Sequence, residues 1–99
     1  MAQHIGCQIV DENSNVINDS GLNFALVFNV LGTKEKYQWL HTIDAYGDTV
    51  FNPLQTPFII SELEKLKSEV DQDMQNLITK FIKLIKTIGI HQYIKFIGD

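Results

Sequence analysis

The chain of 99 residues contains no arginine: all eight of its basic side chains are lysines, against twelve aspartates and glutamates. Arginine is the side chain best suited to bind phosphate groups and guanine edges in a bidentate geometry. Its absence, together with a net charge of −4, argues against nucleic-acid binding as the main function and against a phosphoryl-transfer site. We therefore expect no nucleic-acid partner.

Cysteine and long apolar runs are equally scarce. Cys7 is the single cysteine, so no internal disulfide can form, as is typical of proteins from the reducing cytoplasm. No stretch approaches the roughly 18 consecutive apolar residues of a membrane-spanning helix, and residues 1–5 do not resemble the start of a signal peptide. These absences predict a cytoplasmic protein with no membrane partner.

Sequence motifs with a strong mechanistic meaning are missing too: there is no glycine-rich phosphate loop, no Cys-x-x-Cys pair and no His-Glu-x-x-His. His4, His41 and His91 fall on expected strands and could share a metal only if those strands were neighbours. Nothing flanking Cys7 would activate its thiol, so we interpret this residue as a small buried hydrophobe. We predict that the chain is not an enzyme and that it has no cofactor and no metal site.

What the first half of the chain does contain is the alternation typical of β-strands. Turn-forming polar residues at 11–15 separate two β-rich segments, and Leu22 to Val30 repeat apolar side chains with period two. The pattern predicts a hairpin of residues 4–10 and 16–17, long strands at residues 22–30 and 36–44, and a short strand at residues 49–51.

The second half shows two helical patterns. Thr56 and Pro57 supply an N-cap and a proline at the first helical position, and an apolar stripe continues to about Val70. Residues 71–73 supply the cap of a second helix, whose apolar face recurs at helical spacing up to Ile88. Two helices are therefore expected between residues 56 and 88.

Gly89 is expected to end the second helix in the left-handed conformation, after which residues 90–97 return as a final strand beside an earlier one. Strands that come first and helices that follow predict an α+β fold. We expect a single domain over residues 1–99, with an antiparallel sheet of about five strands, two helices packed on one face, and the order ββββ-αα-β.

The densest polar cluster includes Asp44, Tyr46 and Asp48 on a turn. Its carboxylates could act as an acid–base pair, bind a cation or attract a basic partner, and they could equally serve only to cap the turn. Among the functional interpretations we favour partner contact. We expect Asp44, Tyr46 and Asp48, with Asp11 and Glu12 on the first turn, to bind a protein, because aromatic rings anchor interfaces and carboxylates steer association.

Residues 43–52, with Gln55 and the acidic helix that follows, resemble small bacterial immunity proteins, which neutralise toxins. The ending, residues 93–99, adds to this similarity, which covers the chain from about Tyr37 onwards. The resemblance implies a compact acidic protein that binds a toxin domain, for example a nuclease, and blocks its active site or substrate path. It implies no chemistry carried out by the protein itself.

Two alternatives stay open. A small enzyme or ligand-binding domain would place a pocket between the sheet and the helices near residues 44–52, with His41, Asp44 and Asp48 at its rim. A structural or regulatory homodimer would pair through an exposed strand edge. Stabilisation by a small molecule would favour the first alternative, and the molecular mass in solution tests the second.

Overall fold

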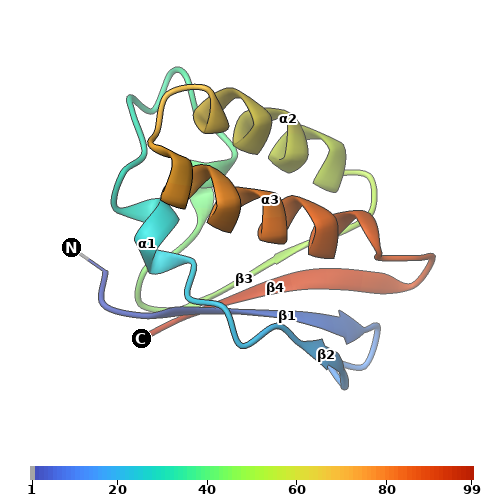
Figure 1. Ribbon diagram of the computed structural model, residues 1–99. Helices are drawn as coiled ribbons and strands as arrows, with labels where there is room; N and C mark the ends of the chain where they lie inside the picture. The colour runs from blue at the N-terminus through green and yellow to red at the C-terminus, as the bar shows by residue number, and fades with distance from the viewer. Residues whose placement is uncertain (1) are drawn as a thin grey trace.

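The computed structural model describes residues 2–99, which form one antiparallel sheet and three α-helices (Figure 1). In chain order the elements are β1 (Ile5–Asp11), β2 (Val16–Asp19), α1 (Ala25–Phe28), a 3₁₀ helix (Leu40–Thr42), β3 (Asp48–Phe51), α2 (Thr56–Lys67), α3 (Gln72–Lys86) and β4 (Gln92–Gly98). All three α-helices lie on the same side of the sheet. The expected fold class, α+β with helices on one face of an antiparallel sheet, is confirmed.

The strand order is β2-β1-β4-β3, so the last strand of the chain lies in the middle of the sheet. β4 pairs with β1 from Ile5 opposite Gly98 to Asp11 opposite Gln92, and with β3 on its other side. The prediction that the final strand lies beside an earlier one is therefore confirmed. The two edges are β2 and β3, each of four residues.

The long strand expected at residues 22–30 is wrong, because this segment contains the short helix α1. Phe24 and Val27, three residues apart, are fully buried, whereas Leu26 is 54% exposed, which is helical and not strand periodicity. The side chain of Asn23 accepts hydrogen bonds from the backbone N–H groups of Ile5 and Ala25 and so sets the first turn of the helix beside β1.

The strand expected at residues 36–44 is also wrong. Neither this segment nor residues 22–30 joins the sheet, which has four strands where about five were expected. Tyr37, Leu40 and Ile43 are buried at a spacing of three residues, as a 3₁₀ helix requires. The carboxylate of Glu62 accepts the backbone N–H groups of Trp39 and Leu40 at 3.0 and 2.9 Å. This cap from α2 satisfies N–H groups that a strand would have used for pairing.

The boundaries of α2 differ slightly from the prediction. Thr56 is the first helical residue and not the N-cap, so Pro57 occupies the second helical position, where its missing N–H also costs no hydrogen bond. The helix ends at Lys67, three residues before the expected end at Val70. The side chain of Asn52 accepts the N–H groups ahead of the helix and directs the chain into it.

The predicted cap of α3 is confirmed, because the Asp71 side chain accepts a hydrogen bond from the backbone N–H of Met74 at 2.9 Å. The expected end is wrong. The helix stops at Lys86, and the left-handed residue after it is His91, with φ of 63°, and not Gly89. The Gln92 side chain accepts the Gly89 N–H at 2.8 Å, which closes a turn that leads into β4.

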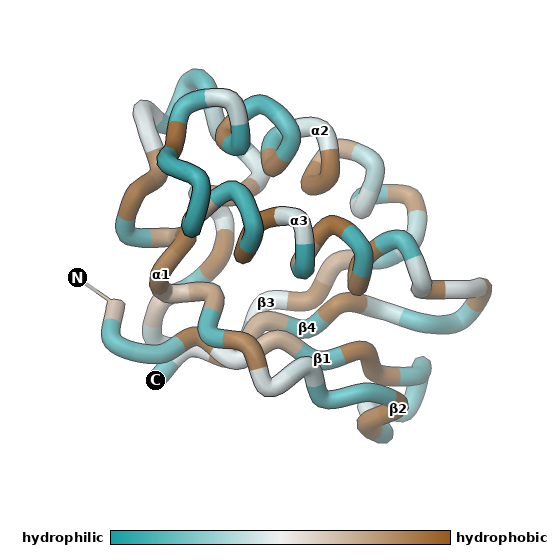
Figure 2. Tube along the Cα trace, viewed as in Figure 1, coloured by the Kyte–Doolittle hydropathy of each residue, from teal (hydrophilic) through white to brown (hydrophobic). Residues whose placement is uncertain are grey.

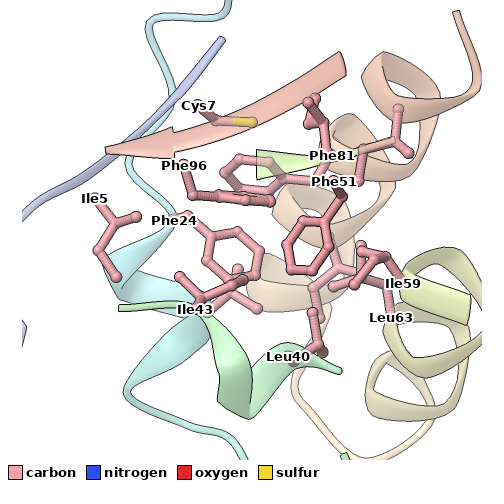
Figure 3. Close-up of a cluster of buried hydrophobic side chains, with 14 of the residues drawn as sticks. Ile5, Cys7, Phe24, Leu40, Ile43, Phe51, Ile59, Leu63, Phe81 and Phe96 are labelled. Carbon is pink, nitrogen blue, oxygen red and sulfur yellow. The ribbon is translucent and has the colours of Figure 1, made fainter. Parts of the chain in front are cut away.

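The core fills the space between the sheet and the helices (Figure 3). The ring centroids of Phe24 and Phe96 lie 4.7 Å apart, and those of Phe24 and Phe81 lie 4.9 Å apart. Cys7 is 1% exposed in this cluster, and burial raises the pKa of its thiol to about 12. The interpretation of Cys7 as a small buried hydrophobe is confirmed. Figure 2 shows that hydrophobic residues also occur on β2, outside this layer.

Candidate binding surface

The acidic residues expected to contact a partner lie at opposite ends of the sheet. The turn that carries Asp44, Tyr46 and Asp48 is joined to the end of β4, where the Gly98 N–H donates to the Gly47 carbonyl at 2.7 Å. Asp11 is at the far end of β1, opposite the first residue of β4, and is followed by Glu12. A strand of seven residues is about 23 Å long, so these groups form two clusters and not one.

Asp11 holds the β1–β2 turn together. Its carboxylate accepts the backbone N–H groups of Asn13 and Asn15, both at 2.9 Å, and the Asn15 side-chain amide at 3.2 Å. The hydrogen bond from the Asn15 backbone, followed by that from Asn13, lowers the pKa of this carboxyl group. Three residues after Asp11, Ser14 has the left-handed φ of 64° that the turn requires. Asp11 therefore has a structural role whether or not a partner binds.

The turn at residues 44–48 is packed against the sheet end. The Asp44 carboxylate accepts the Tyr46 N–H at 2.8 Å. A Cβ atom on Gly98 would lie 2.4 Å from the carbonyl carbon of Ala45, so only glycine allows this close approach. The Tyr46 side chain is 74% exposed and is free to contact another molecule.

Asp48 belongs to a different surface, the sheet face turned away from the helices. Phe51 is buried towards the helices, and Val50 and Asp48 alternate with the core-facing residues of β3. No helix or strand among residues 2–99 covers that second face (Figure 1). We call it the open face. From the pairing registers it comprises Gly6, Gln8, Val10, Val16, Asp19, Asp48, Val50, Tyr93, Lys95 and Ile97.

Two hollows lie on the open face, one towards each end. The first, of about 180 Å³, has Val10, Val50 and Tyr93 as its apolar lining and Asp11 and Glu12 as its acidic lining. It therefore combines an apolar floor with carboxylates.

The second hollow, of about 330 Å³, opens where Gly6 leaves space beside Ile97, and its lining includes Asp19, Asp99 and His4. Also on the open face, the Lys95 ammonium lies 3.6 Å from an Asp48 oxygen, and the amide of Gln8, which lines the second hollow, donates to Asp19 at 3.2 Å. The open face thus has two acidic hollows and two pairs of polar side chains.

Charge is segregated between the sheet and the helices. The segments that form the sheet and its turns, residues 2–21, 44–52 and 92–99, carry six carboxylates and one lysine, a net charge of −5. The other described segments carry six carboxylates and seven lysines, a net charge of +1. Nearly all of the excess negative charge is therefore on the sheet side, where Lys95 is the one cation and already faces Asp48.

The pocket expected between the sheet and helices, with His41, Asp44 and Asp48 at its rim, does not form there. That space holds the hydrophobic core, and Asp48 points to the open face. The His41 ring lies 2.8 Å from the Gly32 carbonyl, and His91 lies 3.3 Å from Glu12. Within residues 2–99, no group of three or more His, Cys, Asp or Glu side chains could hold a metal ion, and no helix could cross a membrane.

A second polar group, around Glu62 and Glu69, was not indicated by the sequence, because acidic residues on a helix usually face solvent. Glu62 lies on α2 among the residues of its apolar stripe and is only 9% exposed. Nearby, Glu69 pairs with Lys36 at 2.6 Å and accepts a short hydrogen bond from Tyr37. The position of Glu62 between Ile59 and Leu66 on the apolar stripe was the available signal. These groups attach residues 36–40 to α2 and to the residues just after it, and so stabilise the fold.

Comparison with known proteins gives no match from which a function could be inferred. The chain matches no protein-family model, no curated protein and no solved structure. The function of this protein must therefore be inferred from the shape and charge of its exposed surface.

Proposed function

We propose that this protein is a small acidic protein-binding module, and specifically an immunity protein that binds and neutralises a bacterial toxin domain. The observation that supports this proposal is the charge segregation: the sheet side has a net charge of −5 in a chain whose helical side is almost neutral. A localised field of one sign speeds the encounter with a partner of opposite sign and orients it.

Neutralisation by occlusion needs complementarity and no chemistry. A nuclease-type toxin must bind polyanionic substrate, so its active-site cleft is rich in lysine and arginine. An acidic surface can cover such a cleft and compete with the substrate phosphates for the same cations. In this proposal the protein blocks the toxin's active site or substrate path and remains chemically unchanged.

Co-expression provides the test in cells. The protein is expressed with the toxin domain encoded next to its own gene, and growth is compared with that of cells expressing the toxin alone. We expect protection from growth arrest. Growth arrest in the presence of folded, abundant protein would contradict the immunity function.

Calorimetry of the purified pair provides the test in solution. We expect binding that weakens as salt is raised from about 50 to about 500 mM, because exposed charges on the two proteins are screened. Affinity that is independent of salt would argue against the charge segregation as the basis of recognition. An adjacent toxin domain that does not bind at any salt concentration would remove the proposal.

A further inference from the structure

We propose that the open face of the sheet is the docking surface, and that its occupant is a protein with a basic, partly apolar surface. This inference rests on the proposed function only for the statement that the partner is a toxin. It moves the centre of contact from the turn at residues 44–48 to β1 and β4, and it makes Asp11, Glu12 and Tyr46 the rim of the interface.

Some apolar side chains of the open face are left uncovered by residues 2–99, although Val10 on the same face is only 2% exposed. Val50 and Val16 are 49% and 53% exposed, and Val50 and Tyr93 line the same hollow. An antiparallel sheet that simply faced water would place polar residues at these alternating positions. Apolar groups surrounded by carboxylates are the composition of a protein interface, which has an apolar core within a polar rim.

Charge identifies the kind of occupant. Five carboxylates, those of Asp11, Glu12, Asp19, Asp48 and Asp99, lie on the open face or line its hollows. A second copy of the chain docked face to face would bring these carboxylates against their equivalents, and a nucleic acid or an anionic membrane would be repelled in the same way. A basic protein surface is the complementary partner.

The size of the face explains why both acidic turns belong to the interface. Four strands about 4.8 Å apart, with seven residues in the longest, give a flat area of about 350 Å². A partner in an interface of standard size covers about 800 Å². The contact must therefore extend beyond the strands, onto the β1–β2 turn at one end and the turn with Tyr46 at the other.

The hollow beside Tyr93 shows what chemistry would enter it. Val10, Val50 and Tyr93 offer an apolar lining, and the carboxylates of Asp11 and Glu12 lie at the same hollow. A lysine or arginine of the partner has an aliphatic stem that can lie on the apolar surface while its charged group meets a carboxylate. We infer that a basic side chain of the partner occupies this hollow.

Substitutions on the two sides of the molecule test the docking surface with the adjacent toxin domain as the probe. Val50→Lys introduces a cation on the open face, and Leu26→Lys introduces the same cation on α1, at a residue that is similarly exposed. We expect Val50→Lys to weaken binding at least about 10-fold and Leu26→Lys to change it less than about 2-fold. The opposite pattern would overturn the docking surface and leave the proposed function standing.

A pair of milder variants keeps this test valid if Val50→Lys does not fold. Asp48→Asn removes a carboxylate from the open face, and Asp73→Asn removes one from the first turn of α3. We expect Asp48→Asn to weaken binding about 3-fold or more through slower association, with no such change for Asp73→Asn. Equal effects of the two variants would contradict the proposal.

A probe that does not depend on the toxin separates the two proposals. A nona-arginine peptide is titrated into the ¹⁵N-labelled protein at about 20 mM ionic strength, where the Debye length is about 20 Å. We expect amide shift changes to concentrate at Gln8, Asp48, Val50 and Tyr93. Changes centred on α2 or α3, or no saturable change, would refute a cation-binding open face. If the peptide maps to the open face and the toxin does not bind, the toxin assignment alone fails.

Discussion

The two faces of the sheet are made from alternate residues of the same strands, yet they are equipped differently. On the covered face, Cys7, Ile94 and Phe96 are at most 1% exposed and belong to the core. On the open face, Gln8 and Lys95 make polar contacts with carboxylates, and Val50 remains half exposed. The covered face stabilises the fold, and the open face is available for recognition. Substitutions placed on one face and then the other test that division.

The largest difference between the faces is expected for truncation of an apolar side chain. Phe96→Ala removes a ring that contacts Phe24 and Phe51, so we expect a loss of about 3–5 kcal/mol in the free energy of unfolding. Val50→Ala should lose less than about 1 kcal/mol, because Val50 is half exposed. Urea denaturation measures both. Comparable losses would mean that the open face is also buried in solution.

The glycines provide a matched pair with a smaller effect. Gly98→Ala would place a Cβ atom 2.4 Å from the Ala45 carbonyl carbon, so the turn at residues 44–48 must shift, at a cost of about 1–3 kcal/mol. In Gly6→Ala, the nearest atoms to the new Cβ lie at 3.8 Å, and we expect a change within about 0.5 kcal/mol. Thermal unfolding of the two variants checks this order. A costly Gly6→Ala would show that the open face is less accessible than the structure indicates.

Alkaline pH should act through the covered face. Burial, followed by the charge of Asp19, raises the pKa of Cys7 from 9.0 to about 12, so the unfolded chain loses this proton first. The stability linked to the thiol is complete below pH 9.0 and is lost as the pH rises towards 12. At about pH 10 we expect a loss of about 1 kcal/mol, measured by urea denaturation.

Cys7→Ala provides the control for this alkaline effect. The variant has no thiol to ionise, so its stability should fall less steeply between about pH 9 and about pH 10. An unchanged pH dependence would show that another group causes the loss. Tyr37, whose pKa burial raises to about 12, is the next group to consider.

The smallest expected effect is at the rim of the open face, in acid. Backbone hydrogen bonds lower the pKa of Asp11 from 3.8, so its contribution to stability is present above pH 3.8 and is lost as the pH falls below that value. Asp11→Asn cannot titrate, and its melting temperature should decline less steeply between about pH 4 and about pH 2.5. Parallel declines in the variant and the wild type would show that Asp11 does not contribute to acid unfolding.

The elements that the sequence predicted correctly are those with local signals. The β1–β2 hairpin follows from Asp11 and its turn, and α3 follows from Asp71 and a regular apolar face. The segment from Leu22 to Leu31 is almost continuously apolar, so a period of two could be read into it although Phe24 and Val27 show helical spacing. The 3₁₀ helix depends on Glu62, a residue 22 positions after Leu40, and no local pattern contains that contact.

The sequence indicated candidate contact residues but not their positions relative to one another. Asp44, Tyr46 and Asp48 form one turn, as the sequence indicated, but Asp11 lies at the other end of the sheet and has a structural role in its own turn. The sequence did not indicate Tyr93, Val50 and Lys95 as contact residues. The same types of residue occur on the two faces of a strand when layers of structure cover both faces of its sheet. These three residues are known to be on an uncovered face only because no helix among residues 2–99 packs on that side of the sheet.

The sequence by itself determined the composition and the local geometry of this protein: its acidity, the lack of arginine, the hairpin, the two long helices and the final strand. These properties depend on single residues or on near neighbours in the chain. Tertiary structure alone decided that β4 lies between β1 and β3, and that five carboxylates from separate segments come together on or beside the sheet face that the helices leave open. The physical reason is that sheet order and layer placement depend on contacts between residues far apart in the chain, so no short segment encodes them.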